Sequence, residues 1–502
     1  MNLSGVFPKD ISGIHFHFVG IKGTGMAALV EILHARGAVI TGSDVEERFY
    51  TDEILEKLGI KALPFSEANI TDSVQFVIYS SAYNSKTNPD LAAAEKKGLP
   101  LFLYSEALGE VSRLAYSCGI CGVHGKTTTT GLTGTILKEL PLSSQVLAGS
   151  IITSFGSSCV MNSPSIKAGT LPDFFAAETC EYQKHFMSFS PKKIILTSVE
   201  SDHQDFYPTY NDILLAFVDY ICLLPEGGTL IYCADDKGAC EAKELSEKKR
   251  PDIKFIPYGV KAEGDYHLTL KDVKAGEQNF SLELTGDLSL RVPGEHNVRN
   301  AAAACALCIE LLKEKGLSYK DYLPSIKKAL LNFSGGKRRS EVIAKTKTPS
   351  GEDVIFIDDY AHHPTAIKTT LKGYRDFYSG HKIIVDFMSH TYTRTAALLK
   401  EFASSFESAD CVIINKIYGS ARETYDGKSV TGEILSKEVQ KFHSSVIYAG
   451  EFDKAAEEGL KLLSEKSGFP DGYLFVTMGA GDNWKVGKLI LEKLNKSERG
   501  AQ

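Results

Sequence analysis

The sequence has 502 residues, and its 63 acidic residues exceed its 56 lysines and arginines, which gives a formal net charge of −7. A mildly acidic chain lacks the overall basic charge typical of nucleic-acid binding. No apolar run approaches the roughly 20 residues of a membrane span, and residues 1–10 hold no apolar signal core. We therefore expect a cytoplasmic protein of about three domains, monomeric or homodimeric, that binds neither nucleic acid nor membranes.

Ten cysteines are scattered along the chain, which does not resemble a disulfide framework. The pairs Cys118-x-x-Cys121 and Cys305-x-x-Cys308 have a spacing that also occurs in zinc and redox sites. The first pair lies in an apolar run and the second in an alanine-rich helical pattern. Both settings favour buried free thiols.

The first third of the chain alternates short apolar runs with helical patterns. Strands are predicted at residues 14–19, 38–41 and 74–80, and helices at 25–36, 51–58 and 88–97. Strands separated by helices favour βαβ units and a parallel sheet. We therefore predict a Rossmann-like α/β domain over residues 1–112.

A glycine turn, Gly20-x-x-Gly23-x-Gly25, joins the first predicted strand to the first predicted helix. Its spacing is the reverse of the dinucleotide fingerprint, and Asp44 follows the second strand, where such folds often contact a ribose hydroxyl. Lys22 would add positive charge for a pyrophosphate. The residues leave two interpretations open, a dinucleotide cofactor and a second phosphate-bearing substrate.

The most informative segment is residues 122–130, Gly-Val-His-Gly-Lys-Thr-Thr-Thr-Thr. It follows an apolar run and begins a helical pattern, so backbone N–H groups and the positive helix end would face one anion. Lys126 adds a mobile charge, and the Thr127 hydroxyl suits Mg²⁺. Ile120 stands where the usual phosphate-loop pattern has glycine. A plain glycine turn before a capped helix is the alternative, but the setting predicts a nucleoside triphosphate site.

The remaining pattern predicts two further α/β domains. Residues 193–198, 211–222, a strand-rich stretch at 254–292 and helices at 297–315 and 319–331 complete a central P-loop, ATPase-like domain over 113–334. Residues 334–337 resemble a hinge. Strands at 354–357, 382–386, 411–415, 445–448 and 474–478 then predict a Rossmann-like C-terminal domain over 335–502 with about five strands.

Several segments together resemble the Mur ligases, in order and over essentially the whole chain: residues 20–26, 122–130, Glu178 with 200–203, 294–300 and 358–364. The resemblance implies an ATP-dependent ligase that forms ADP, acting on UDP-N-acetylmuramate. Residues 337–339, 358–364 and 478–482 are most similar to the members that add L-alanine. In the implied reaction, ATP phosphorylates the muramyl carboxylate, and the amine of L-alanine attacks the acyl phosphate.

The resemblance assigns roles to particular residues. Lys126 would bridge phosphates, Thr127 would hold one Mg²⁺, and Glu178 with His203 would hold a second; Cys180-Glu181 stands where many relatives have Asp-Glu. Arg339 would reach the γ-phosphate, whereas Arg338 is expected to be solvated. The implied ATP-binding residues are Gly122, His124, Gly125, Lys126, Thr127, Thr128, Asn297, Asn300, Asp359 and His362, and Asn297 is also expected to cap its helix.

The amino acid and the nucleotide sugar have their own implied residues. His390 and Arg394 would handle a substrate carboxylate, although Thr391 replaces an arginine expected between them. The first glycine loop would take UDP rather than NAD, with Gly23, Thr24, Gly25, Met26, Ser43, Asp44 and Ser81 as binding residues. Residues 479–482 are predicted chiefly as a turn and helix cap.

Three alternatives remain. A related ligase attaches the tripeptide L-Ala-γ-D-Glu-diaminopimelate to the same nucleotide sugar. Members that extend longer precursors usually carry a lysine near the metal site, and residues 208–222 contain none. A catalytically silent nucleotide-gated binding protein would tolerate loss of Lys126, Glu178 or His203, yet all three are present. A dehydrogenase would explain the first glycine loop but not the second.

Overall fold

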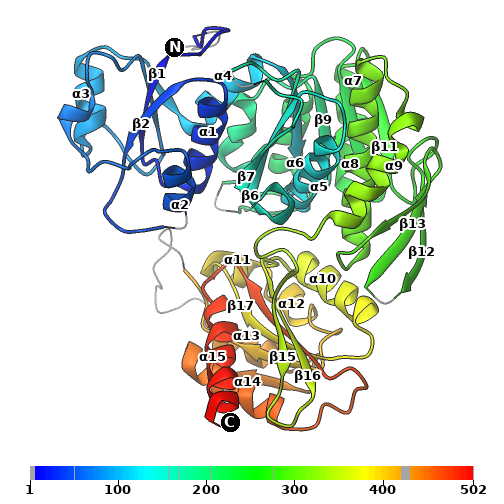
Figure 1. The fold of residues 1–502 in the computed structure, drawn as a ribbon. Coiled ribbons are helices and arrows are strands. Elements are labelled where there is room, and N and C mark those ends of the chain that lie inside the picture. Colours follow the sequence, from blue (N-terminus) through cyan, green and yellow to red (C-terminus); the bar gives the residue numbers. More distant parts are fainter. Residues whose placement is uncertain are drawn as a thin grey trace.

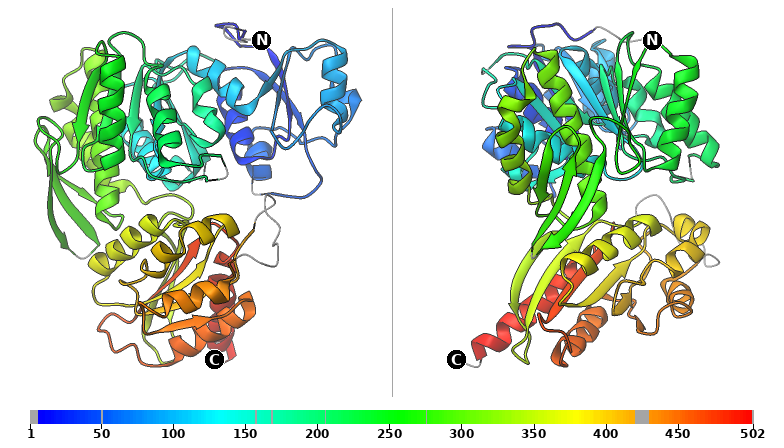
Figure 2. Two further views of the ribbon diagram at one scale, coloured as in Figure 1. Left: turned by 180° about the vertical axis from the view of Figure 1, so that it is seen from behind. Right: turned by 90° about the vertical axis from the view of Figure 1, so that its right-hand side faces the viewer.

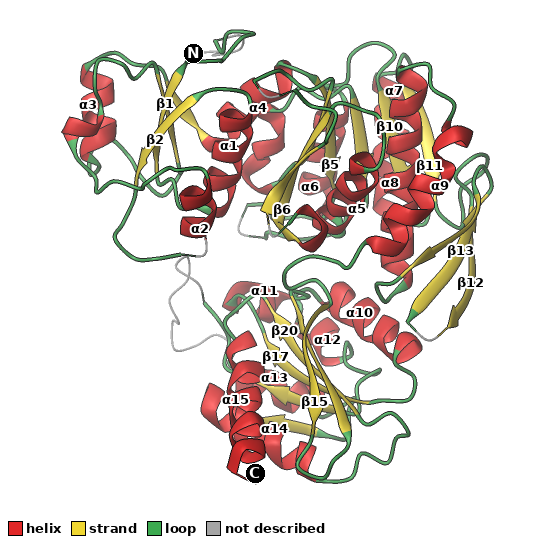
Figure 3. Ribbon diagram, viewed as in Figure 1, coloured by secondary structure: helices red, strands yellow, loops and turns green. Residues whose placement is uncertain are grey.

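The structure, a computed structural model, describes residues 6–49, 51–156, 158–167, 169–204, 206–274, 276–419 and 430–500, with only the backbone of 496–500. The chain forms three α/β parts, each built on a sheet with helices packed against it (Figures 1 and 3). The first and central parts lie side by side, and the third lies against one side of them. This arrangement confirms the predicted three-domain α/β fold class. The exact domain boundaries stay predictions.

The first part contains a four-stranded parallel sheet in the order β2-β1-β3-β4. Its strands are β1 (His15–Val19), β2 (Val39–Ser43), β3 (Phe76–Tyr79) and β4 (Leu101–Leu103). Its helices are α1 (Thr24–Ala35), α2 (Thr51–Lys57), α3 (Pro89–Lys96) and α4 (Tyr104–Arg113). The predicted alternation of strands and helices is therefore confirmed.

The first and central parts share one hydrophobic core. Apolar side chains of α1 pack with those of the central sheet in a single cluster. Arg36, at the end of α1, is also buried there, and its Nε donates to Gln145 Oε1 at 3.0 Å. Burial lowers the pKa of Arg36 to about 9. This shared cluster packs the two parts directly against each other.

The central part is built on a seven-stranded sheet in the order β11-β10-β9-β5-β8-β6-β7, parallel except for the β6–β7 pair. Its strands are β5 (Tyr116–Cys121), β6 (Ser144–Ile152), β7 (Ser158–Asn162), β8 (Phe174–Glu178), β9 (Lys193–Leu196), β10 (Thr229–Cys233) and β11 (Lys254–Tyr258). Its helices are α5 (Lys126–Lys138), α6 (Tyr210–Ile221), α7 (Lys237–Lys249), α8 (Glu295–Glu314) and α9 (Tyr319–Asn332). Short 3₁₀ turns occupy Thr153–Phe155 and Tyr182–Ser188 in this part and Glu67–Asn69 in the first part.

An antiparallel ribbon completes the central part. Its strands are β12 (Leu268–Lys274), β13 (Glu277–Leu282) and β14 (Gly286–Leu290). Helix α8 is buried on most of its surface because its run of alanines lets α5 approach closely. All four CxxC cysteines are buried free thiols, as predicted. The ribbon reaches toward the third part, where β12 contacts α10 (Figure 2).

The third part contains a six-stranded sheet in the order β15-β16-β20-β17-β18-β19. Its strands are β15 (Glu341–Lys347), β16 (Asp353–Asp359), β17 (Lys382–Met388), β18 (Cys411–Ile414), β19 (Val446–Tyr448) and β20 (Tyr473–Gly479). Helices α10 (Pro364–Phe377), α12 (Leu399–Ala403) and α13 (Gly432–Val439) pack in one apolar cluster, and α14 (Phe452–Ser464) and α15 (Trp484–Gly500) in another. A short helix, α11 (Tyr392–Ala397), follows β17.

The prediction of about five strands in this sheet was one short, because all five predicted strands are present as β16 to β20 and a sixth joins them. The sixth strand, β15, pairs antiparallel with β16 at the sheet edge. Its apolar residues Val342 and Ile343 are 45% and 49% exposed, so the strand lacks the buried apolar run that identifies β16, β17, β18 and β20. None of the described helices is both long and apolar enough to cross a membrane.

The expectation that Arg338 is solvated was also wrong. Its Nε donates to Asp358 Oδ2 at 2.8 Å, and its two terminal nitrogens donate to the carbonyls of Gly479 and Gly481 at 2.7 and 2.9 Å. Arg338 thus joins the first residues of the third part to the ends of β16 and β20. Burial raises the pKa of Asp358, and the charge of Arg338 opposes this rise.

We expect Arg338→Ala to lower the free energy of unfolding by about 3 kcal/mol, because it leaves the buried Asp358 carboxylate without its cation. The matched control is Arg291→Ala, an exposed arginine paired with the half-buried Glu277, with an expected loss under about 1 kcal/mol. Urea unfolding followed by circular dichroism measures both. Equal losses in the two variants would contradict the structural role of Arg338.

Candidate active site

The carboxyl ends of three neighbouring central strands, β9, β5 and β8, form the centre of the candidate site. Parallel strands end at the same edge of a sheet, so the segments that follow them come together. These segments are residues 122–125 after β5, 178–181 at the end of β8 and 198–203 after β9. They line one side of a cavity of about 540 Å³, and residues of the third part line the other.

The glycine turn after β5 has the geometry of a phosphate-binding loop. Gly122 and Gly125 adopt positive φ angles of 131° and 82°, which side chains disfavour, and a β-carbon on Gly125 would collide with the Asn300 amide. Ser198 fixes the turn, because its carbonyl accepts from the Val123 N–H and its hydroxyl accepts from the His124 N–H. The N-terminus of α5 therefore faces the cavity as an anion site.

Lys126 is held inside this cavity by charge. Its Nζ lies 2.8 Å and 3.0 Å from the two carboxylate oxygens of Glu181 and donates to the Gly122 carbonyl at 2.5 Å. Burial alone would lower the pKa of Lys126, but the negative charge of Glu181 raises it above its usual value. For Glu181 the effects are reversed, because burial alone would raise its pKa, but the positive charge of Lys126 and the contact with His203 lower it. Both groups are therefore charged at neutral pH.

Glu178 stands where two cavities meet. Its carboxylate accepts from the Gly149 N–H at 2.7 Å, and a β-carbon on Gly149 would displace this carboxylate. Glu178 and Cys180 line both the large cavity and a second one of about 180 Å³ between the first and central parts. Thr24 and Gly25 of the first glycine loop line the smaller cavity. The two glycine loops thus open onto opposite sides of one carboxylate.

The third part supplies the opposite wall of the large cavity. Asp359 accepts from the N–H groups of Ser340 and Ala361, which fixes the loop after β16. The Arg339 guanidinium lies 4.8 Å from the centre of the Tyr360 ring. Burial lowers the pKa of His362 well below its usual value, so this imidazole is neutral. Lining residues on this wall are Arg339, Ser340, Asp359, Tyr360, Ala361, His362, His363, Thr365, Ala366, Thr369 and Thr370.

A buried ion pair joins the central and third parts. Nε and Nη2 of Arg394 lie 3.1 and 2.7 Å from Asp202 Oδ1, and both side chains are less than a tenth exposed. Burial would raise the pKa of Asp202, but Arg394 and the neighbouring histidines lower it far below its usual value. Arg394 also donates to the His390 carbonyl. Asp202 lines the cavity, whereas His390 and Arg394 stand outside its lining.

The first glycine loop is braced by its own neighbours. Asp44 accepts from the backbone N–H groups of Lys22 and Val45, so its carboxylate is already engaged. The Lys22 ammonium donates to the carbonyls of Val45 and Glu47, and its expected role toward a pyrophosphate stays a prediction. The other predicted residues differ in exposure: Met26 and Ser43 are buried, Thr24 and Gly25 are half-buried, and Gly23 and Ser81 are exposed.

Asn297 and Asn300 both line the large cavity, but Asn297 does not cap its helix. Helix α8 begins two residues earlier, after Gly294, and the Asn297 Nδ2 donates to the Pro293 carbonyl at 2.7 Å. The capping prediction was therefore wrong. Asn300 Nδ2 lies 3.3 Å from Asn297 Oδ1, so the two amides are linked.

Sequence reasoning missed the partners of several site residues. Glu200 accepts from the Thr365 hydroxyl at 2.6 Å, and Asp202 pairs with Arg394, each across the two facing parts. Glu200 and Asp202 stand within a recognised segment, but their partners are 165 and 192 residues away. No local pattern signals contacts at that separation.

Models of protein families match the chain in three consecutive stretches. They are the Mur ligase family catalytic domain at residues 15–116, the Mur ligase middle domain at 120–308 and the Mur ligase glutamate ligase domain at 338–481. The chain therefore belongs to the Mur ligase family. This membership agrees with the interpretation as a ligase rather than as a dehydrogenase.

Several individual proteins similar to this chain share one activity within the family. The UDP-N-acetylmuramate–L-alanine ligase of Treponema pallidum (strain Nichols) is 47% identical over 489 residues, which cover 97% of this chain and 98% of that protein. The ligase of the same name from Borreliella afzelii is 37% identical over 471 residues, covering 93% and 96%. The crystal structure of UDP-N-acetylmuramate–alanine ligase from Thermotoga maritima has a TM-score of 0.72 at 25% identity, covering 96% and 100%.

The buried Asp202–Arg394 pair predicts a specific pH dependence. Because the folded-state pKa of Asp202 is depressed, its contribution to stability is complete above the unfolded value of about 3.8 and declines as pH falls below it. Asp202→Asn removes this contribution. The stability difference between wild type and Asp202→Asn should therefore shrink by about 1 kcal/mol between pH 5 and pH 3. Denaturant unfolding across this range measures it, and a constant difference would contradict the pairing.

Proposed function

We infer that the chain joins L-alanine to the lactyl carboxylate of UDP-N-acetylmuramate and converts ATP to ADP and phosphate. Family membership over all three parts and the two alanine-ligase relatives support this inference. The observation that carries it is the meeting of the two cavities at Glu178, because one cavity begins at each glycine loop. A sugar-linked carboxylate from one side can thus meet a phosphoryl group from the other.

The reaction has two steps. The γ-phosphoryl group of ATP passes to a carboxylate oxygen, giving an acyl phosphate and ADP. The amine of L-alanine then attacks the acyl carbon, phosphate leaves and the amine loses a proton. Because charge crowds around the transferred phosphoryl group, positioning and cations supply most of the catalysis. Lys126, held at the mouth of the glycine turn, is the cation we assign to the phosphates, and Arg339 faces it from the third part.

The site also suits Mg²⁺. Glu178 and Glu181 together carry more negative charge than Lys126 neutralises, and the Thr127 hydroxyl is a further oxygen donor on the cavity wall. Carboxylate and hydroxyl oxygens are the ligands that Mg²⁺ prefers. We assign Thr127 to one Mg²⁺ and Glu178 with His203 to a second, and His203 Nε2 lies 3.3 Å from Glu181 Oε1. The ions would offset the charge of the phosphates.

The nucleotide and the nucleotide sugar occupy separate cavities in this proposal. ATP would lie against residues 122–128, with Asn297 and Asn300 on the central side and Asp359 and His362 on the third. UDP would meet the first glycine loop through Gly23, Thr24, Gly25 and Met26, with Ser43, Asp44 and Ser81 nearby in the chain.

The amino acid would enter from the third part. Arg394 offers a guanidinium for its carboxylate, and His390 lies next to it. Asp202 now occupies that guanidinium, so we expect it to compete with, or orient, the incoming carboxylate. Thr391 provides no second cation, which makes this subsite less basic than a His-Arg pair would be.

We expect Lys126→Ala to lower phosphate release by at least about a thousandfold, because the transferred phosphoryl group loses its principal cation. Binding of UDP-N-acetylmuramate should stay nearly unchanged, since the first glycine loop lies in the other cavity. Lys138→Ala, at the exposed end of the same helix, is the matched control. Turnover of Lys126→Ala at the control rate would contradict the proposed ATP site.

The amino-acid substrate is tested by measuring phosphate release with ATP, Mg²⁺ and UDP-N-acetylmuramate. One set of reactions receives L-alanine and the other the tripeptide L-Ala-γ-D-Glu-diaminopimelate. We expect turnover with L-alanine alone and negligible turnover with the tripeptide. Turnover only with the tripeptide would overturn the proposed substrate, and turnover with neither would favour a binding protein that lacks the chemistry.

A further inference from the structure

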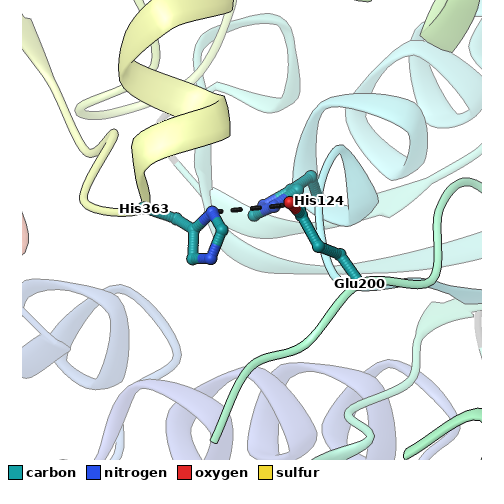
Figure 4. Close-up of side chains that lie close together, drawn as sticks. All are labelled: His124, Glu200 and His363. Atoms are coloured by element: carbon teal, nitrogen blue, oxygen red, sulfur yellow. Dashed lines mark hydrogen bonds and ion pairs between the residues drawn. The ribbon is translucent and has the colours of Figure 1, made fainter. Parts of the chain in front are cut away.

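Three side chains that could bind a metal converge where the central and third parts meet (Figure 4). His124 lies in the glycine turn, Glu200 follows β9, and His363 immediately precedes α10. His124 Nε2 lies 2.9 Å from Glu200 Oε2, and His363 Nδ1 lies 3.8 Å from the same oxygen. One ligand atom from each residue lies within 4.8 Å of the other two.

His363 is the unusual member of this cluster. It is 3% exposed, and neither of its ring nitrogens has a hydrogen-bond partner among the described residues. Buried polar atoms nearly always have such a partner, so a buried imidazole without one indicates that a ligand or ion binds there. Burial lowers the pKa of His363 to about 4, with a further contribution from His124, so the imidazole is neutral at neutral pH and one of its ring nitrogens keeps a free lone pair.

Glu200 completes the cluster as an anion. Burial would raise its pKa, but hydrogen bonds from His124 and the Thr365 hydroxyl lower it below the usual value. Two imidazole nitrogens and one carboxylate oxygen form a ligand set that Zn²⁺ accepts with a fourth position open. Zn²⁺ bonds of about 2.0–2.1 Å in a tetrahedron place ligand atoms about 3.4 Å apart. The observed 2.9 and 3.8 Å separations bracket that value.

We propose that His124, Glu200 and His363 bind a Zn²⁺ ion that bridges the glycine turn and the third part. The site is chemically distinct from the proposed Mg²⁺ site, because Mg²⁺ prefers oxygen ligands and near-octahedral geometry. Two ligands come from the central part and one from the third, so the bound ion ties together the two walls of the large cavity. Tying these walls slows their separation, and Zn²⁺ therefore inhibits the release of product nucleotide.

Binding is tested on the full chain, freed of metal by a chelator and kept without nucleotide, because triphosphates bind Zn²⁺ themselves. Equilibrium titration with Zn²⁺ and a chromophoric competitor gives stoichiometry and affinity. We expect one site per chain, with affinity reduced at least about tenfold in His363→Ala and in Glu200→Gln. His34→Gln, a histidine exposed at the end of α1, should bind as the wild type does.

A competing site must be excluded. Cys180 is an exposed thiol next to Glu181, and thiolates bind Zn²⁺ strongly. We therefore expect Cys180→Ser to retain the site. Loss of the site in Cys180→Ser with retention in His363→Ala would overturn the proposal, as would unchanged affinity in His363→Ala or no saturable binding to the wild type. Circular dichroism of each variant verifies that it is folded.

A second measurement depends on the proposed function, unlike the titration. With Mg²⁺ in excess, added Zn²⁺ should lower steady-state phosphate release by the wild type, and His363→Ala should need at least about tenfold more Zn²⁺ for the same fractional loss. Equal sensitivity of the two proteins would overturn the inhibitory role while leaving the titration to decide on the site.

Discussion

The arrangement of charged side chains in the central part depends on one buried lysine, Lys126, that must remain charged. Burying the Lys126 ammonium away from water costs free energy unless an anion lies beside it. Glu181, which follows the neighbouring strand β8, is that anion. The strand order places β8 and β9 on either side of the glycine turn, so Glu178 and Glu181 lie on one side of Lys126 and His203 lies on the other. The ion pair keeps the ammonium in place at the N-terminus of α5, where a phosphate would also bind.

The third part depends on the same edge of the central sheet. Its contacts to that edge are polar and specific: Arg394 to Asp202, and Thr365 to Glu200. Interfaces held by a few polar contacts separate more readily than apolar cores do, because water can replace their partners one at a time. The packing of the third part against this edge therefore depends on the charge of two acidic residues that follow β9.

Much of this could be predicted from the sequence, because the relevant signals are local. The alternation of apolar runs and helical patterns fixes the α/β class, and residues 122–130 carry the phosphate loop in nine consecutive positions. The rest depends on contacts between distant residues. Strand β15 has exposed apolar side chains and is defined by its pairing with β16. Arg338 is isolated in sequence from the carbonyls of Gly479 and Gly481 that bind it. The pairing of Asp202 with Arg394 likewise has no local signature.

The hydrophobic cluster that spans the first and central parts bears on how the chain folds as it is synthesised. Helix α1 packs against β6 and β7, which are made more than a hundred residues later. Until residues 144–162 leave the ribosome, α1 keeps an apolar face in water, and Arg36 lacks Gln145. The first part therefore cannot complete its packing until residues 144–162 have been synthesised. Until then the apolar face of α1 is exposed to water, and we expect chaperones to protect the nascent chain mainly during this period.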